Sequence, residues 1–123
     1  MATLTTVEGV QYYFDPKGIV AISDHDPSIG QAVTCVYGIS TQYLHVSDSV
    51  PVFMAGLSNA KDFQQVTRAD GNPMWINTPA VTSIRSRVAT DPPGVNAVLV
   101  AESITQSIQE TAAAEANTLN VPK

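Results

Sequence analysis

The chain has 123 residues, of which 44% are hydrophobic and 14% are charged, and its formal net charge is −5. This hydrophobic content excludes a disordered chain, and the length fits one compact domain or two very small ones. No apolar run approaches the ~20 residues of a membrane span, no N-terminal secretion signal is recognisable, and the acidic balance disfavours a nucleic-acid partner.

The composition favours strands. Fifteen Val, eight Ile and twelve Thr stand against five Leu. β-Branched side chains pack well on a pleated surface and lose rotamer freedom in helices. Seven Gly and eight Pro provide frequent turns. We therefore expect a mainly β fold with short helices.

The first half of the chain predicts five short strands and a helix. The strands are expected at residues 3–7, 11–14, 19–23, 31–37 and 42–46. Glu8-Gly9 has the chemistry of a tight hairpin turn, because Gly accepts positive φ. Ser47-Asp48 offers an N-cap for a helix over residues 50–57, whose first turn accommodates Pro51.

The second half repeats this order of elements. Asp70-Gly71 matches Glu8-Gly9, and Ile84 matches Ile22, both at an offset of 62 residues. After a Pro-rich loop, residues 96–98 match 31–33 at an offset of 65. Strands are expected over 95–101 and 104–109, followed by a helix over 112–117 with Thr111 as its N-cap. We interpret residues 1–60 and 61–123 as two pseudo-symmetric repeats of a small antiparallel β unit, each ending in a short helix. They pack as one compact body because each alone is marginal in size.

Each unit has an apolar strand, an acid-Gly turn, an aromatic-rich strand ending in Asn or Asp, and apolar residues three apart. These features lie at residues 8–22 with Val46–Val50, and at residues 70–84. The pattern resembles the small flagellar β proteins of the FlbD/SwrD type, which carry it in a single copy. The resemblance implies a small β fold and a bacterial regulatory or adaptor role, and it brings no catalytic residue.

The overall character resembles a second class of protein. A short, acidic, lysine-poor β chain rich in Ala, Thr, Val and Ser is similar to the accessory proteins of tailed-phage virions, such as capsid decoration proteins. This resemblance implies a structural protein whose partners are capsid or other assembly subunits, as a homo-oligomer or as part of a larger assembly.

Five side chains are candidate partner contacts: Tyr13, His45, Trp75, Arg85 and Arg87. Tyr13 and Trp75 occupy matching strands on one face, where they form either an exposed aromatic strip or core packing. Arg85 and Arg87 flank Ser86, so a strand places both on one face. They then meet an acidic patch on a partner, or remain a solvated or ion-paired couple.

Three other residues have possible chemical roles. His25 lies between Asp24 and Asp26, a pattern for a metal site or a general base, although such Asp residues more often cap turns. His45 stands near Ser47 and Asp48, too close in sequence for a catalytic triad. Cys35 reads as a small buried hydrophobe, with a reactive thiol or an intermolecular bridge as alternatives. We expect no catalytic residue, no cofactor and no metal.

The sequence thus predicts a non-enzymatic structural or interaction protein, above all a phage virion accessory protein such as a capsid decoration protein. One alternative is an FlbD-type regulatory or adaptor module. Another is a small-ligand-binding or hydrolytic β protein that uses His25, His45 and the two arginines. The expected location is the virion or the bacterial cytoplasm, with neither membrane nor nucleic acid as a partner.

Overall fold

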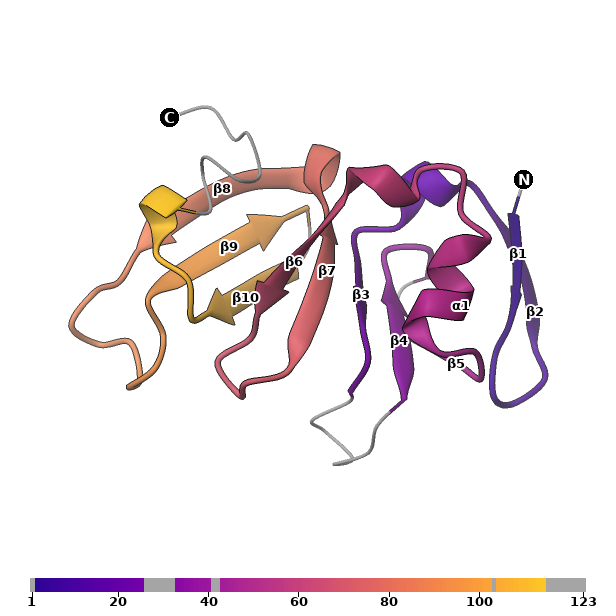
Figure 1. Ribbon diagram of the computed structural model, residues 1–123, viewed down its shortest axis with the longest axis horizontal. Coiled ribbons are helices and arrows are strands. Elements are labelled where there is room, and N and C mark those ends of the chain that lie inside the picture. Colours follow the sequence, from indigo (N-terminus) through magenta and orange to yellow (C-terminus); the bar gives the residue numbers. More distant parts are fainter. Residues whose placement is uncertain (1, 26–32, 41–42, 103, 115–123) are drawn as a thin grey trace.

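Short antiparallel strands make up most of the structure, a computed structural model that describes residues 2–25, 33–40, 43–102 and 104–114 (Figure 1). The expectation of a mainly β fold with short helices is confirmed. The strands are β1 (Ala2–Thr5), β2 (Gln11–Phe14), β3 (Ala21–Ser23), β4 (Thr34–Tyr37), β5 (Leu44–Val46), β6 (Phe63–Thr67), β7 (Pro73–Asn77), β8 (Val81–Ser86), β9 (Ala97–Ala101) and β10 (Ile104–Ile108). The helix α1 spans Val50–Ala55, and single 3-10 turns occupy Pro16–Gly18 (η1), Ala60–Asp62 (η2) and Thr78–Ala80 (η3).

Several element ends differ from the sequence-based expectation. The first strand ends at Thr5, because Thr6 already begins the turn: its N–H donates to the Val10 carbonyl at 2.8 Å. The helix is capped by Ser49 and not by Ser47-Asp48, so Val50 and Pro51 fill its first two positions, where no N–H is needed. Near the C-terminus, residues 112–114 are helical and residues 115–117 lie outside the described part of the chain.

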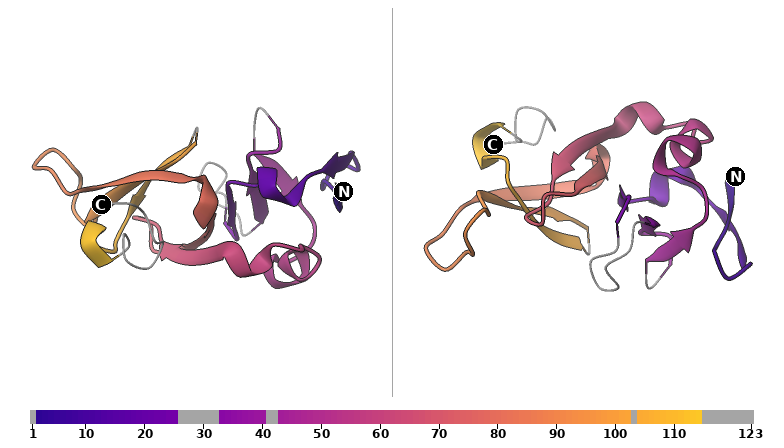
Figure 2. Two further views of the ribbon diagram at one scale, coloured as in Figure 1. Left: turned by 90° about the horizontal axis from the view of Figure 1, so that it is seen from above. Right: turned by 60° about the horizontal axis from the view of Figure 1, so that its bottom comes forward.

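The strands form three antiparallel sheets. The largest has the order β5-β4-β3-β7-β6, another has the order β10-β9-β8, and β1 and β2 form a hairpin. Single bridges connect these sheets, since Thr6 pairs with Val46 and Arg68 pairs with Ile108. Figures 1 and 2 show the β1–β2 hairpin and the β8–β10 sheet at opposite ends of the long axis.

The centre of the largest sheet joins the two halves of the chain. β3 pairs with β7 through Ala21–Ile76, Ile22–Trp75 and Ser23–Met74. The buried Asn77 extends this junction, because its N–H donates to the Val20 carbonyl at 3.0 Å. Its Nδ2 also donates to the Ile19 carbonyl at 2.8 Å. A strand from each half therefore meets edge to edge at the middle of the molecule.

Two hydrophobic clusters form the core, and each takes side chains from both halves. Most of the first cluster comes from residues 4–57, but Phe63 belongs to it and Trp75 packs against it. Most of the second comes from residues 66–108, but Val20 and Ala21 belong to it. Neither half completes its own core.

The segment before β3 packs tightly against the turn after β4. Gly38 has a φ of +112°, and a Cβ atom there would lie 2.6 Å from the Gly18 carbonyl oxygen and 2.8 Å from the Val20 nitrogen. This close backbone approach requires glycine. In the described part of the chain, no helix is both long and apolar enough to cross a membrane.

Candidate functional site

Arg85 and Arg87 hold the loop that follows β8. The guanidinium of Arg85 makes two hydrogen bonds to the Asp91 carboxylate, at 2.9 and 3.0 Å. Arg87 lies beyond the end of β8 and donates to the carbonyls of Asp91, Pro92 and Val95. The two arginines predicted to contact a partner thus bind residues 91–95 of their own chain, and half of the Arg85 side chain stays exposed.

Asp91 is the centre of this loop. Its carboxylate accepts hydrogen bonds from Arg85 and from the Val88 N–H. These bonds, Arg85 first, lower the pKa of Asp91 from its usual 3.8 to about 2. The same pairing raises the pKa of Arg85. The ion pair is therefore fully charged at neutral pH.

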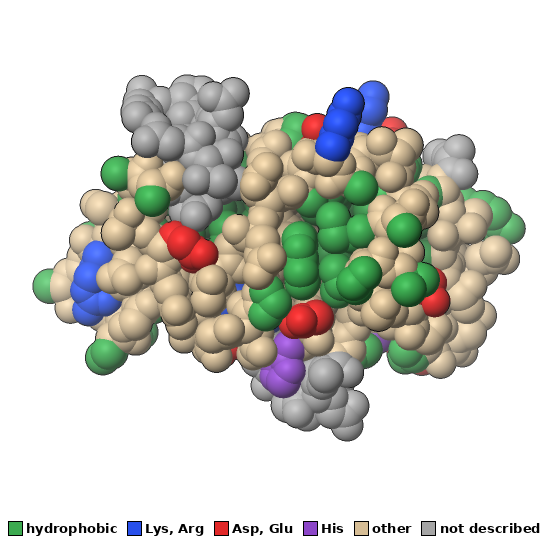
Figure 3. Space-filling view, in the orientation of Figure 1, with side chains coloured by type: hydrophobic (Ala, Val, Ile, Leu, Met, Phe, Trp, Pro, Cys, Tyr) green, Lys and Arg blue, Asp and Glu red, His purple; other side chains and the backbone are tan. Residues whose placement is uncertain are grey.

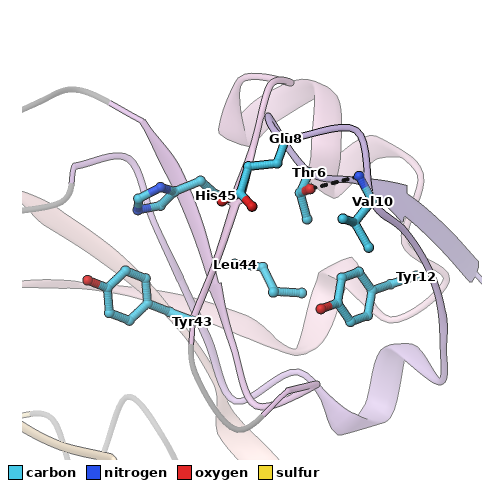
Figure 4. Close-up of a pocket in the computed structure, with 7 residues that line it drawn as sticks. All are labelled: Thr6, Glu8, Val10, Tyr12, Tyr43, Leu44 and His45. Carbon is cyan, nitrogen blue, oxygen red and sulfur yellow. Dashed lines mark hydrogen bonds between the residues drawn. The ribbon is translucent and has the colours of Figure 1, made fainter.

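His45 belongs to an aromatic group beside a small recess. The ring centroids of Tyr43 and His45 are 5.5 Å apart, as are those of Tyr37 and Tyr43. The recess has a volume of about 250 Å³. Figure 4 shows Tyr43 and His45 on one side of it and Tyr12 on the other, with the Thr6 hydroxyl accepting a hydrogen bond from the Val10 N–H. Aromatic faces and one imidazole suit contact with a planar or apolar group.

Trp75 lines a larger groove between α1 and the strands of the central junction. The groove encloses about 630 Å³, and its walls include Val7, Val33, Val50 and Pro51 besides Trp75. Figure 3 shows hydrophobic side chains gathered in the middle of this face, between the two halves of the molecule. Trp75 is half-buried, packs against the first core cluster and pairs with Ile22. It therefore serves both of the roles that the sequence left open.

Tyr13 is the most exposed large hydrophobic side chain in the described part of the chain, at 68%. It lies on β2, the outer strand of the N-terminal hairpin. Most of the other exposed large hydrophobics also belong to the first half: Val7, Val10, Tyr43 and Val52, with Val88 alone in the second half. The first half therefore presents the more apolar surface.

The residues with possible chemical roles do not converge. His45 lines the small recess, whereas Ser47 and Asp48 line the Trp75 groove. Through its backbone carbonyl, His25 accepts hydrogen bonds from Ser23 and Arg68, and Asp26 lies outside the described residues. Cys35 is fully buried in β4. Across the residues whose positions are described, no three His, Cys, Asp or Glu side chains gather as a metal site would require.

Arg68 is an important residue that the sequence reading missed. Only 10% of its side chain is exposed, and Nη1 donates to the His25 carbonyl at 3.3 Å. Nη2 lies 3.7 Å from the Asp70 carboxylate. Arg68 thus ties the second half of the chain to the first. A position just before an acid-Gly turn gives no sign of burial, so only the packing of the halves reveals this role.

Comparison of the chain with protein-family models, curated proteins and solved structures finds no significant match. The function is therefore argued from the surfaces described above.

Proposed function

We propose that this protein is a non-enzymatic structural protein that docks on other proteins, and specifically an accessory protein that coats the capsid of a phage virion. The observation that carries this proposal is the apolar surface of the first half. Val7, Val10, Tyr13 and Val52 are each about half exposed or more, and Val7 also lines the Trp75 groove. Exposed apolar groups that adjoin a groove are typical of protein-binding surfaces.

We also propose that the chain is a tandem duplication of one β unit, as a modular coat protein would use. Matching contacts 62 residues apart support it. Thr6 bridges Val46 as Arg68 bridges Ile108. The Thr6 N–H donates to Val10, as the Arg68 N–H donates to Asn72, at 2.8 and 2.9 Å. Gly9 and Gly71 have φ values of +89° and +87°.

The strand registers extend this correspondence and refine the offset. Leu4 pairs with Tyr12 as Val66 pairs with Met74, again 62 residues on. Ala21 pairs with Tyr37 as Ser83 pairs with Val100. Tyr37 thus corresponds to Val100, an offset of 63 and not the 65 that matched residues 31–33 to 96–98. The sequence match placed the length change correctly in the loop but overestimated it.

Cosedimentation with phage heads tests the docking role. The heads come from the phage whose genome carries this gene. We expect the protein to sediment with them, and Val7→Ser and Val52→Ser to weaken binding. Val88→Ser is the matched control, because Val88 is a similarly exposed valine, at 46%, in the second half. Failure of the unsubstituted protein to sediment with the heads would overturn the proposal, as would equal binding by all three variants.

The second candidate is an adaptor of the FlbD type, favoured by the acid-Gly hairpin and bridge that occur in each half. Genes for motility or signalling beside this one would favour the adaptor, whereas genes for head, tail and packaging proteins would favour the virion protein. The hydrolytic alternative has less support, because His45 and Ser47 open into different hollows.

A further inference from the structure

Two strand edges have no partner strand among the described residues. β2 is paired only with β1, and β8 is paired only with β9. The two edges lie toward opposite ends of the molecule (Figure 1). An open edge presents a row of backbone donors and acceptors, which readily pairs with another strand.

The internal junction indicates which strand fits each open edge. β2 has the same register to β1 as β7 has to β6, and β8 has the same register to β9 as β3 has to β4. β7 and β3 are the two strands that pair at the centre of the molecule. The open edges are thus counterparts of two edges that already fit each other.

We propose that β8 of one copy pairs with β2 of the next copy, so that the chains assemble head to tail. Carrying over the β3–β7 register places Ser83 opposite Phe14, Ile84 opposite Tyr13 and Arg85 opposite Tyr12. This inference rests on the tandem repeat within the proposed function, but it does not depend on the capsid.

The backbone of β2 is oriented for this pairing. Hydrogen-bonded and non-hydrogen-bonded pairs alternate along an antiparallel ladder. The bond from the Thr6 N–H to the Val10 carbonyl therefore leaves the Tyr13 N–H and C=O directed away from β1. At the internal junction, the bond from Asn77 to Val20 likewise directs the backbone of Ile22 toward Trp75. Ile84 and Tyr13 are the counterparts of that pair.

The side chains and charges of the two edges are complementary. Tyr13 is 68% exposed, whereas its counterpart Trp75 is half-buried beside Ile22. In the assembly Ile84 would cover Tyr13 in the same way. Residues 1–60 carry five acidic and one basic side chain, and residues 61–123 carry six acidic and five basic ones. Glu8 and Asp15 flank β2, while Arg85 lies on β8, so opposite charges approach each other.

One substitution between the halves weakens the junction between copies. Asn77 donates its amide to the Ile19 carbonyl. Its counterpart is Asp15, whose carboxylate accepts from the Lys17 N–H and has no proton to donate to a carbonyl. The contact between copies therefore lacks one buried hydrogen bond of the internal junction. We expect reversible, concentration-dependent association. Because the contact is heterologous, it builds a ring if the rotation closes and a filament if it does not.

Sedimentation velocity from micromolar to millimolar concentration tests this assembly. Proline has no N–H, so Tyr13→Pro removes an outward donor and leaves the β1–β2 ladder intact. We expect the loss of all species larger than the monomer. Gln11→Pro is the matched control, because its counterpart Pro73 already lies outside the three pairs of the internal junction. We expect Gln11→Pro to assemble normally. Asp15→Asn should restore the missing amide donor and shift assembly to lower concentration.

Cysteine cross-linking tests the register without relying on a proline variant. Opposed residues in such a pair have Cα atoms about 5.5 Å apart, within disulfide range. A mixture of Tyr13→Cys and Ile84→Cys chains should form a covalent dimer upon oxidation, and a mixture of Gln11→Cys and Ile84→Cys chains should not. The inference is overturned if the unsubstituted protein is monomeric at all concentrations. It is also overturned if Tyr13→Pro and Gln11→Pro assemble alike, or if both mixtures link equally. Binding of monomeric Tyr13→Pro to phage heads separates this outcome from the docking role.

Discussion

Replacing Gly38 by Ala tests the tight packing on which the central junction depends. The added Cβ would lie 2.6 Å from the Gly18 carbonyl oxygen, and Val20 atoms lie 2.8 Å from it. The backbone strain of an L-residue at a φ of +112° contributes about 1–3 kcal/mol. Displacing backbone neighbours adds about 1–3 kcal/mol. We expect the free energy of unfolding to fall by about 2–5 kcal/mol.

Gly9→Ala and Gly71→Ala are the matched controls. Both glycines have φ near +90°, but a Cβ atom at either position has no neighbour within 4 Å. Only the backbone term then applies, about 1–2 kcal/mol. Urea unfolding followed by circular dichroism measures all three. If Gly38→Ala loses no more stability than the two controls, Gly38 does not pack against the start of β3 as described.

Three further predictions follow from individual contacts. Because Asp91 has a pKa of about 2, lowered from 3.8, its ion pair stabilises the fold fully above pH ~4. That stabilisation is lost as the pH falls through about 2, and an NMR titration of the Asp91 carboxyl with a midpoint near 4 would contradict the loop geometry. Arg68→Ala should lower the free energy of unfolding by about 1–3 kcal/mol, and Arg68→Met by less because it keeps the aliphatic stem. Equal losses would deny the stem a packing role. Trp75, the only tryptophan, lies at the junction, so its fluorescence and the circular dichroism should report one coincident unfolding transition. Two separated transitions would mean that the halves unfold independently.

The local elements of this fold are predictable because their causes are local. Glu8-Gly9 and Asp70-Gly71 indicate hairpin turns, and both glycines adopt positive φ. The strong β-branched content likewise indicates strands. The exact ends of elements depend on single hydrogen bonds, such as the one from Thr6 to Val10 that ends the first strand. Such bonds leave no trace in a hydrophobic pattern.

The contacts between distant segments were not predictable. Nothing in the sequence states that β3 pairs with β7, because strand pairing across the chain depends on how the whole core closes. The same holds for Arg85 and Arg87, which alternate as partner-binding residues would but close a loop on Asp91. Tyr13 and Trp75 were identified from their matching positions, and the structure places one on an open edge and the other beside a groove.

The shared core has a consequence for the order in which the protein folds. Val20 and Ala21 pack in a cluster made mostly of residues beyond 65, and the first cluster needs Phe63. Synthesis proceeds from the N-terminus, so the first sixty residues leave the ribosome with the pairing side of β3 open and their cluster unfinished. That exposed state lasts until β7 has been synthesised. Stalling translation before Asn77 would therefore hold the chain in its most aggregation-prone form, because any other nascent copy offers the same unpaired edge.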